Sequence, residues 1–240
     1  MSALVLTDCV AWVGGLAATT YSNSLSVKQT AEEKPTTCFG GGGWKSVIGG
    51  LKTVEVDLKG FWESAVDEPG FTNMGVADTP MSFGATATET TPFWFFQGSN
   101  FNYDRGGGVG DVDPFGLSIR GTNSVGLAYG QLAKAKGDVS TTGAIGSAVQ
   151  LGAGSAGKYL YAVLHVFTAG TTISMKVQSD DNSGFTSASD VASATINSVT
   201  AVGATWMTRV DASAITDDWF RLNVTTCTGT FNIGAALAIQ

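Results

Sequence analysis

Residues that could carry out catalysis are few in this 240-residue sequence, and their spacing does not suit it. His165 is the only histidine, and it lies inside the apolar stretch 159–167, which indicates a packed interior side chain rather than a general base. The cysteines Cys9, Cys38 and Cys227 form no CxxC pair, so a zinc site would lack its usual ligands. The sequence therefore predicts no enzyme, no metal and no cofactor.

Acidic pairs and glycine runs also stand in the wrong surroundings for chemistry. Asp180 with Asp181 lacks the spaced ligand set of a calcium loop. The glycine run 40–43 precedes Trp44 and a Lys-Ser pair, but Trp44 occupies the position where a phosphate-binding P-loop requires glycine. We expect both segments to be surface turns or loops.

Composition and charge define the fold class more clearly. Lys and Arg total 13 against 20 Asp and Glu, so the net charge is −7, which argues against binding nucleic acid through its phosphates. Hydrophobic residues make up 43%, and 32 glycines lie among many Thr, Ser and Val, which is typical of short strands joined by tight turns. The sequence predicts an all-β protein with one or two short helices, near 71–77 and 185–191. We expect no signal peptide and no membrane span.

Three segments of the first half have counterparts in the second half. The matched pairs are 54–59 with 173–178, 70–72 with 184–186, and 115–119 with 220–224. The first pair alternates apolar and polar residues, the pattern of a half-buried strand. These matches predict a tandem duplication of one β-sandwich domain.

The domain boundaries follow from these matches and from composition. Residues 1–135 are expected to form the first sandwich and residues 158–240 the second, with 136–157 as a linker rich in Gly, Ser and Thr or as a weakly ordered strand. The second half could be a duplicate of the first or a surface decoration domain.

Several segments resemble the major tail tube proteins of long-tailed, siphovirus-like bacteriophages. Residues 32–40 contain a Thr- and Phe-bearing loop, and residues 48–62 lead from an Ile-Gly-Gly-Leu-Lys turn into the alternating strand. Residues 109–121 are similar to the family's later segment before its closing strands. Gly49 stands where that turn usually has Pro. The C-terminal half also resembles C-terminal halves of phage tail proteins.

The resemblance implies a structural virion protein that works as an assembly. Two tandem sandwiches would leave strand edges open, so that the sheets of neighbouring subunits join into a closed barrel. A homotrimer with pseudo-six-fold symmetry would form each ring if both halves are tube domains, and a homohexamer if the second half is a decoration. The stacked rings would form the conduit for genome ejection.

Partners and location follow from the same resemblance. The tape measure and tail terminator proteins of the tail would be partners, and viral DNA would pass without sequence-specific binding. The expected location is the virion tail, assembled in the host cytoplasm.

Two sets of residues are candidate sites under this resemblance. A Gly-rich loop would reach the next ring, with Thr36, Thr37, Phe39, Trp44 and Ile48 as its contact residues. The strand that follows would face the lumen with its charged side, through Glu55 and Asp57. An acidic lumen would repel DNA and prevent adhesion during passage.

Two other functions compete with a tail tube. Trp206 and Trp219 could stack on sugars in a carbohydrate-binding sandwich, although tryptophans more often fill cores and subunit contacts. A capsid decoration protein would use the same sandwich chemistry.

Overall fold

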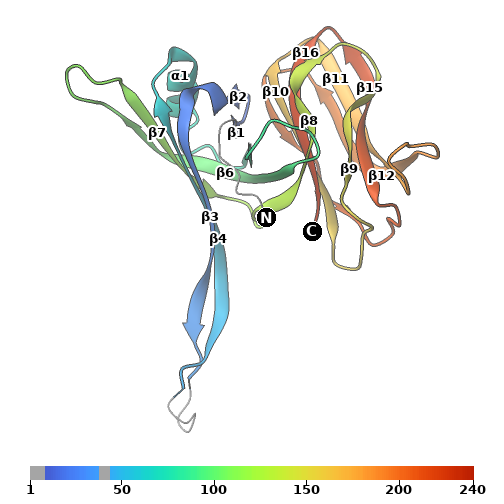
Figure 1. Cartoon of the computed structure of the whole chain (residues 1–240), viewed down its shortest axis with the longest axis horizontal. Coiled ribbons are helices and arrows are strands. Elements are labelled where there is room, and N and C mark those ends of the chain that lie inside the picture. The colour runs from blue at the N-terminus through green and yellow to red at the C-terminus, as the bar shows by residue number, and fades with distance from the viewer. Residues whose placement is uncertain (1–8, 38–43) are drawn as a thin grey trace.

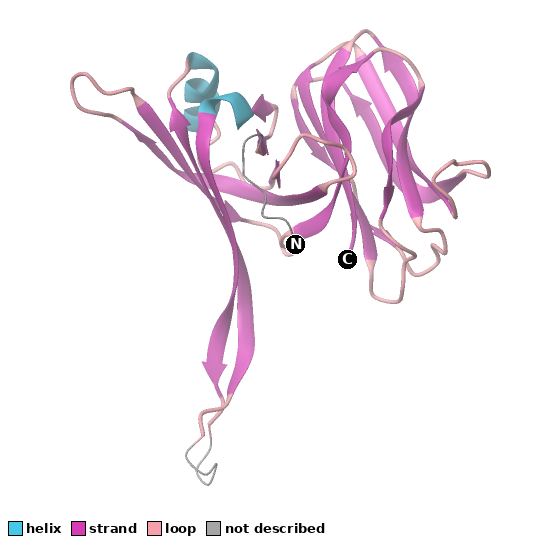
Figure 2. Ribbon diagram, viewed as in Figure 1, coloured by secondary structure: helices cyan, strands magenta, loops and turns pink. Residues whose placement is uncertain are grey.

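Strands dominate the chain, as the composition predicts. The computed structural model describes residues 9–37 and 44–240, and strand makes up 62% of these described residues. Figure 1 shows two β-rich halves side by side, with one long hairpin that projects away from both, and Figure 2 shows how little helix there is. The prediction of an all-β protein is confirmed.

The elements have the following bounds. The first half contains β1 (Val10–Val13), β2 (Leu16–Ala17), the 3₁₀ helix η1 (Ala18–Tyr21), β3 (Ser22–Pro35), β4 (Val47–Phe61), α1 (Ser64–Thr72), β5 (Thr79–Gly84), β6 (Pro92–Arg105) and β7 (Pro114–Gly121). The second half contains β8 (Ala128–Val139), β9 (Gly143–Gln150), β10 (Tyr159–Thr168), β11 (Thr172–Asp180), β12 (Ser189–Val199), β13 (Gly203–Trp206), β14 (Val210–Asp211), β15 (Trp219–Thr228) and β16 (Phe231–Ile239).

The helices differ in part from the expectation. A helix is present close to the expected region 71–77, but it spans Ser64–Thr72. Residues 185–191 form turns and the start of β12 instead of a helix. No helix among the described residues is long and apolar enough to cross a membrane.

Strand β6 is shared by two parts of one large sheet. Its first half pairs with β5 on one side and with β8 on the other. Its second half pairs with β7, which continues through β4 to β3. We call the four strands β3, β4, β7 and the second half of β6 the open sheet. The described strands of the single chain form no closed barrel.

The alternation in residues 54–59 gives the open sheet one buried face. Val54, Val56 and Leu58 are 6% exposed or less and pack in one core with residues of β5, β7 and α1. Glu55 and Asp57, between them, point to the other face and are partly exposed. The predicted half-buried strand is confirmed as part of β4.

The second half is a two-layer sandwich, which we call the C-terminal sandwich. One layer contains β13, β10, β16 and β8, and the other has the order β12-β11-β15-β9. Residues of both layers share one hydrophobic cluster, with Leu160, Phe220 and Phe231 fully buried.

The segment 136–157, expected to be a linker, contains the end of β8 and all of β9. Strand β9 pairs with β15 and buries Val149 in the sandwich core. Small residues hide this strand in the sequence because they are needed for close packing: a Cβ at Gly146 would lie 2.0 Å from the carbonyl oxygen of Ala133. The C-terminal sandwich therefore includes strands that come before residue 158.

The segments that recur in the two halves occupy similar strand pairs. Two of the three lie in β4 and β7 in the first half and in β11 and β15 in the second, and both strand pairs are antiparallel. The third does not match, since residues 70–72 end α1 whereas residues 184–186 lie in turns. Leu58 lies opposite Leu117, and the matched Val177 lies opposite Leu222. The flanking strands differ, since β3 precedes β4 along the chain whereas β12 follows β11. Tandem duplication stays a prediction, and the two matched strand pairs have the same local register.

His165 joins the two halves in the interior. Its ring is fully buried on β10, and Nδ1 donates to the carbonyl of Gly14 at 2.7 Å. The hydroxyl of Ser82 donates to Nε2, also at 2.7 Å, and the ring of Trp12 lies 5.4 Å away between centroids. The expected packed interior histidine is what the structure contains. Burial lowers the pKa of His165 to about 4, although the hydrogen bond to Gly14 opposes this shift.

The buried histidine predicts a specific acid sensitivity. Because the pKa of His165 is about 4 in the folded chain and 6.5 for an unperturbed histidine, the unfolded chain binds the proton first as the pH falls. The unfolding free energy should therefore decrease between pH 6.5 and pH 4, by about 3 kcal/mol from this group alone. Urea unfolding at a series of pH values measures the effect.

The control is His165→Gln, which keeps a neutral polar side chain but cannot titrate. Subtracting its pH profile from that of the wild type removes the contribution of the carboxylates. Parallel profiles for the two proteins between pH 4 and 6.5 would show that His165 does not cause the effect.

Candidate assembly surfaces

One face of the open sheet is polar. The side chains that share this face by strand register are Ser24, Ser26 and Lys28 on β3, Glu55, Asp57 and Lys59 on β4, Ser118 and Arg120 on β7, and Asn102 and Asp104 on β6. The opposite face of the same strands covers the core. The open sheet therefore presents a hydrophilic surface along its width.

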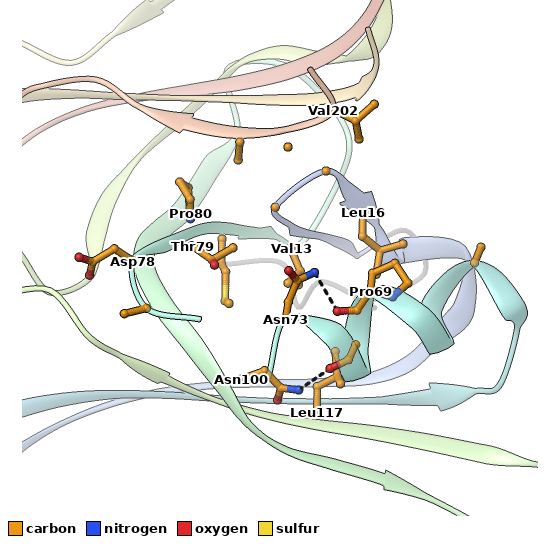
Figure 3. Close-up of a pocket in the computed structure, with 18 residues that line it drawn as sticks. Val13, Leu16, Pro69, Asn73, Asp78, Thr79, Pro80, Asn100, Leu117 and Val202 are labelled. Carbon is orange, nitrogen blue, oxygen red and sulfur yellow. Dashed lines mark hydrogen bonds between the residues drawn. The ribbon is translucent and has the colours of Figure 1, made fainter. Parts of the chain in front are cut away.

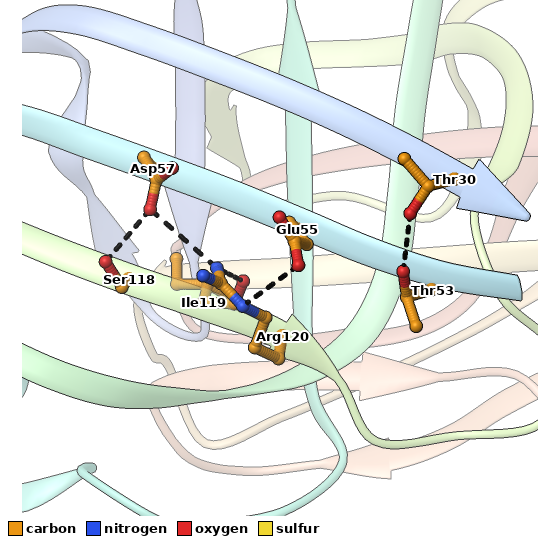
Figure 4. Close-up of polar contacts among 7 residues, drawn as sticks. All are labelled: Thr30, Thr53, Glu55, Asp57, Ser118, Ile119 and Arg120. Carbon is orange, nitrogen blue, oxygen red and sulfur yellow. Dashed lines mark hydrogen bonds and ion pairs between the residues drawn. The ribbon is translucent and has the colours of Figure 1, made fainter. Parts of the chain in front are cut away.

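Arg120 forms ion pairs with Glu55 and Asp57, the two carboxylates that the sequence predicted to face the lumen. Its Nε lies 3.6 Å from Oε1 of Glu55, and its Nη1 lies 3.7 Å from Oδ1 of Asp57 (Figure 4). Asp57 also accepts a hydrogen bond of 2.9 Å from the hydroxyl of Ser118. The register produces this cluster, since Arg120 lies opposite Glu55 and Ser118 lies opposite Asp57. Glu55 and Asp57 do share one face, as the alternation predicts.

The polar face is balanced in charge rather than acidic. It contains the cations Lys28, Lys59 and Arg120 and the anions Glu55, Asp57 and Asp104. The excess of acid expected from β4 alone is absent from these residues because β3 and β7 supply cations at neighbouring positions. The sequence of one strand does not reveal which residues of other strands lie beside it.

Both outer strands of the open sheet have an edge without a strand partner among the described residues, which we call a free edge. Among the described strands, β3 pairs only with β4. In β6, pairing with β5 ends at Gly98, an isolated bridge joins Asn100 to Met74, and residues 101–105 pair only with β7. Phe101 lies within this edge segment as the extra residue of a bulge and is 57% exposed. Exposed edges of this kind can pair with another chain.

The hairpin of β3 and β4 continues far beyond β7. Pairing of β4 with β7 begins at Glu55, so we call residues 29–37 and 44–54 the arm (Figure 1). The part of β4 in the arm, residues 47–54, is about 26 Å long at the rise of a β-strand. A two-stranded ribbon is marginally stable alone in water, so the arm is suited to ordering against a partner.

The end of the arm contains most of the sequence-predicted contact residues. The backbone N–H of Thr36 donates to the carbonyl of Ser46 at 2.8 Å, and the N–H of Ser46 donates to Oγ1 of Thr37 at 3.0 Å. Trp44 and Ile48 are 84% and 59% exposed. Phe39 lies outside the described residues. Whether these exposed apolar side chains contact another chain stays a prediction.

A cavity opens at the other end of the open sheet, beside α1. We call it the α1 cavity; its volume is about 610 Å³ (Figure 3). Its wall combines the turn after β1, one side of α1, the start of β5 and the loop before β13. The turn meets that loop closely, since a Cβ at Gly15 would lie 2.5 Å from Cγ1 of Val202. Asn100 supports the wall by donating from Nδ2 to the carbonyl of Gly70 at 3.2 Å.

The sequence did not indicate the α1 cavity or Arg120. The cavity is built from four segments that are distant in the sequence, and none of them carries a motif. Arg120 could have been found from charge alone, as the one basic residue in the strand segment 114–121.

The tryptophans considered for sugar binding do not form one platform. Trp206 lies on β13 and packs against Phe95 and Tyr161, with ring centroids 5.4 and 6.1 Å apart. Trp219 lies on β15, in the other layer of the C-terminal sandwich. Within the part of the chain that is described, no group of three or more His, Cys, Asp or Glu could hold a metal ion.

Comparisons with known proteins give weak likenesses to phage and virion components. No family model matches the chain, and no curated protein matches its sequence. A chain in the virion of a native gene transfer agent particle aligns with a TM-score of 0.43 and 14% identity, over 53% of this chain and 98% of that chain. The SPP1 Dit protein, described as a paradigm of the hub adsorption apparatus in phages that infect Gram-positive bacteria, aligns with a TM-score of 0.38 and 15% identity, over 97% and 99%. A chain of the phage p2 baseplate aligns with a TM-score of 0.33 and 8% identity, over 95% and 97%.

The polar cluster predicts a modest role for Arg120 in stability. Arg120→Gln should lower the unfolding free energy by less than about 1 kcal/mol, because its ion pairs are partly exposed and their charges are screened by water. The difference from the wild type should shrink as salt is added. Urea unfolding at low and high salt provides the measurement.

Lys28→Gln is the matched control, since it removes a cation from the same face that forms no ion pair among the described residues. A loss of several kcal/mol in Arg120→Gln would contradict this interpretation and make Arg120 part of the fold's core support.

Proposed function

We propose that this chain is a structural, non-catalytic virion protein of the phage-tail type. In its finer form, the proposal is a major tail tube subunit that polymerises into stacked rings around a conduit for genome ejection. The observation that carries the proposal is the pair of free edges on the open sheet. The resemblance of residues 32–62 and 109–121 to major tail tube proteins supports the same reading.

The two free edges are complementary in direction. Successive strands of the open sheet are antiparallel, so β3 and the second half of β6 run in opposite directions. An edge β6 of one copy placed against β3 of the next would continue the antiparallel alternation. Such a head-to-tail contact uses two different surfaces and closes into a ring when the rotation permits it.

The differences between the halves favour six chains in a ring over three. The C-terminal sandwich has no counterpart of the arm, and its second layer covers the sheet that continues from β6. A half of this kind fits a decoration on the outside of the ring. The mass of an isolated ring separates six copies from three.

The polar face suits the wall of the conduit. Its cations and anions are equal in number, so a DNA phosphate would meet no net attraction there. Arg120, the cation best placed to bind phosphate bidentately, is already engaged by Glu55 and Asp57. We propose that Glu55 and Asp57 face the lumen as acceptors for Arg120 rather than as a repelling surface.

The partners remain those that the resemblance implies. Tape measure and tail terminator proteins would define the length and the end of the tube. The location would be the virion tail, with assembly in the host cytoplasm.

Ring formation at the free edges is the central test. Electron microscopy of concentrated protein should show hollow rings or tubes. Phe101→Asp places a charge at the edge segment of β6 and should abolish rings while leaving a folded monomer by circular dichroism.

Thr195→Asp provides the matched control. Thr195 is exposed on β12, an edge strand of the C-terminal sandwich, and its substitution should leave the rings intact. A wild-type protein that stays monomeric at every concentration would refute the proposed function, as would normal rings from Phe101→Asp.

A further inference from the structure

We propose that the α1 cavity is the receptor for the arm of a second copy of this chain. The inference rests on the proposed function and adds the partner surface to it: the arm of one ring would enter the α1 cavity of the ring next to it. Three properties of the described residues lead to this pairing, namely their placement, their apolar surface and their charge.

Placement excludes docking of the arm within its own chain. The arm and the α1 cavity lie at opposite ends of β4, whose first residue is in the arm and whose last residue precedes α1 by a short turn (Figure 1). Strand β4 contains 15 residues and is therefore about 50 Å long. A hydrogen-bonded strand cannot fold back over that distance, so any cavity of this kind that the arm reaches belongs to another copy. Head-to-tail stacking brings these two ends together.

The arm presents apolar side chains that are exposed to solvent. Trp44, Val47, Ile48 and Leu51 are 84%, 48%, 59% and 79% exposed. Elsewhere in the described chain most larger apolar side chains lie in three buried clusters, although others, such as Phe71 and Val109, are also exposed. A concentration of exposed apolar groups at the end of a projecting ribbon indicates a surface that becomes buried on contact.

The α1 cavity has an apolar wall and enough volume to hold apolar side chains of the arm. Val13, Leu16, Pro69 and Pro80 line it, from four different elements or loops, and Val202 closes one side (Figure 3). Its volume of about 610 Å³ can hold a large aromatic side chain together with neighbouring aliphatic ones. Among the described lining residues, Asp78 is the only charged one.

The net charges of the two surfaces are opposite in sign. The described residues of the arm contain Lys34, Lys45 and Lys52 against Glu32 and Glu33, and Lys34 forms an ion pair with Glu32. Residues 60–104 contain six Asp and Glu and no Lys or Arg. Among these acids Asp78 lies in the cavity wall, and Glu68 lies on α1 next in sequence to the lining residue Pro69. Opposite charges at the rim of an apolar contact orient the partners and exclude mismatched ones.

The test compares stacking with ring formation for variants at each side of the contact. Trp44→Ala removes the largest exposed apolar group of the arm. Ala65→Trp fills the cavity from an exposed position on α1. Each should shorten the tubes seen by electron microscopy by about tenfold at a given concentration, as expected for loss of a central aromatic anchor. The mass of isolated rings should stay that of the wild type.

A charge exchange checks that the two surfaces meet. Lys45→Glu and Glu68→Lys should each impair stacking, and the double variant should recover tubes longer than either single variant forms. Lys158→Glu, an exposed reversal on the C-terminal sandwich, is the control and should stack as the wild type does.

The outcomes separate this inference from the proposed function. Absence of rings in the wild type would refute the proposed function. Rings that form and stack to full length in Trp44→Ala and Ala65→Trp would overturn the inference alone, as would a double charge variant no better than its parents or wild-type rings that never stack.

Discussion

Backbone hydrogen bonding at β6 is the constraint on which the rest of the molecule depends. The first half of this strand has partners on both sides, and its second half has a described partner only in β7, beyond the isolated bridge at Asn100. The same strand thus anchors the C-terminal sandwich and ends the open sheet with an unfinished edge. Because β3 also lacks a second partner among the described strands, the open sheet has an unpaired edge at each side, and such edges can pair with another chain.

The sequence predicted those properties that depend on a single helix or strand. The alternation from Val54 to Leu58 predicted a half-buried strand, and the apolar surroundings of His165 predicted its burial. Composition predicted the all-β class. These properties depend on side-chain type and on neighbours along the chain, so one sequence is sufficient to predict them.

Features that depend on pairing between distant segments could not be predicted. The charge balance of the polar face arises because Arg120 lies opposite Glu55, 65 positions earlier in the chain. Strand β9 was mistaken for a linker because its glycine and alanine residues give no apolar pattern. These small residues allow close packing instead, as at Gly146. The α1 cavity has the same origin, since its walls meet only in the folded chain.

The continuity of the large sheet also has a mechanical meaning. Strands β6, β8, β16 and β10 are joined by hydrogen bonds from the open sheet into the C-terminal sandwich, with His165 and Trp12 packed at the junction. A domain joined by a flexible linker could reorient freely, whereas the C-terminal sandwich is joined to the open sheet by paired strands and moves with them. A force applied to the C-terminal sandwich would therefore be transmitted to the open sheet through these paired strands.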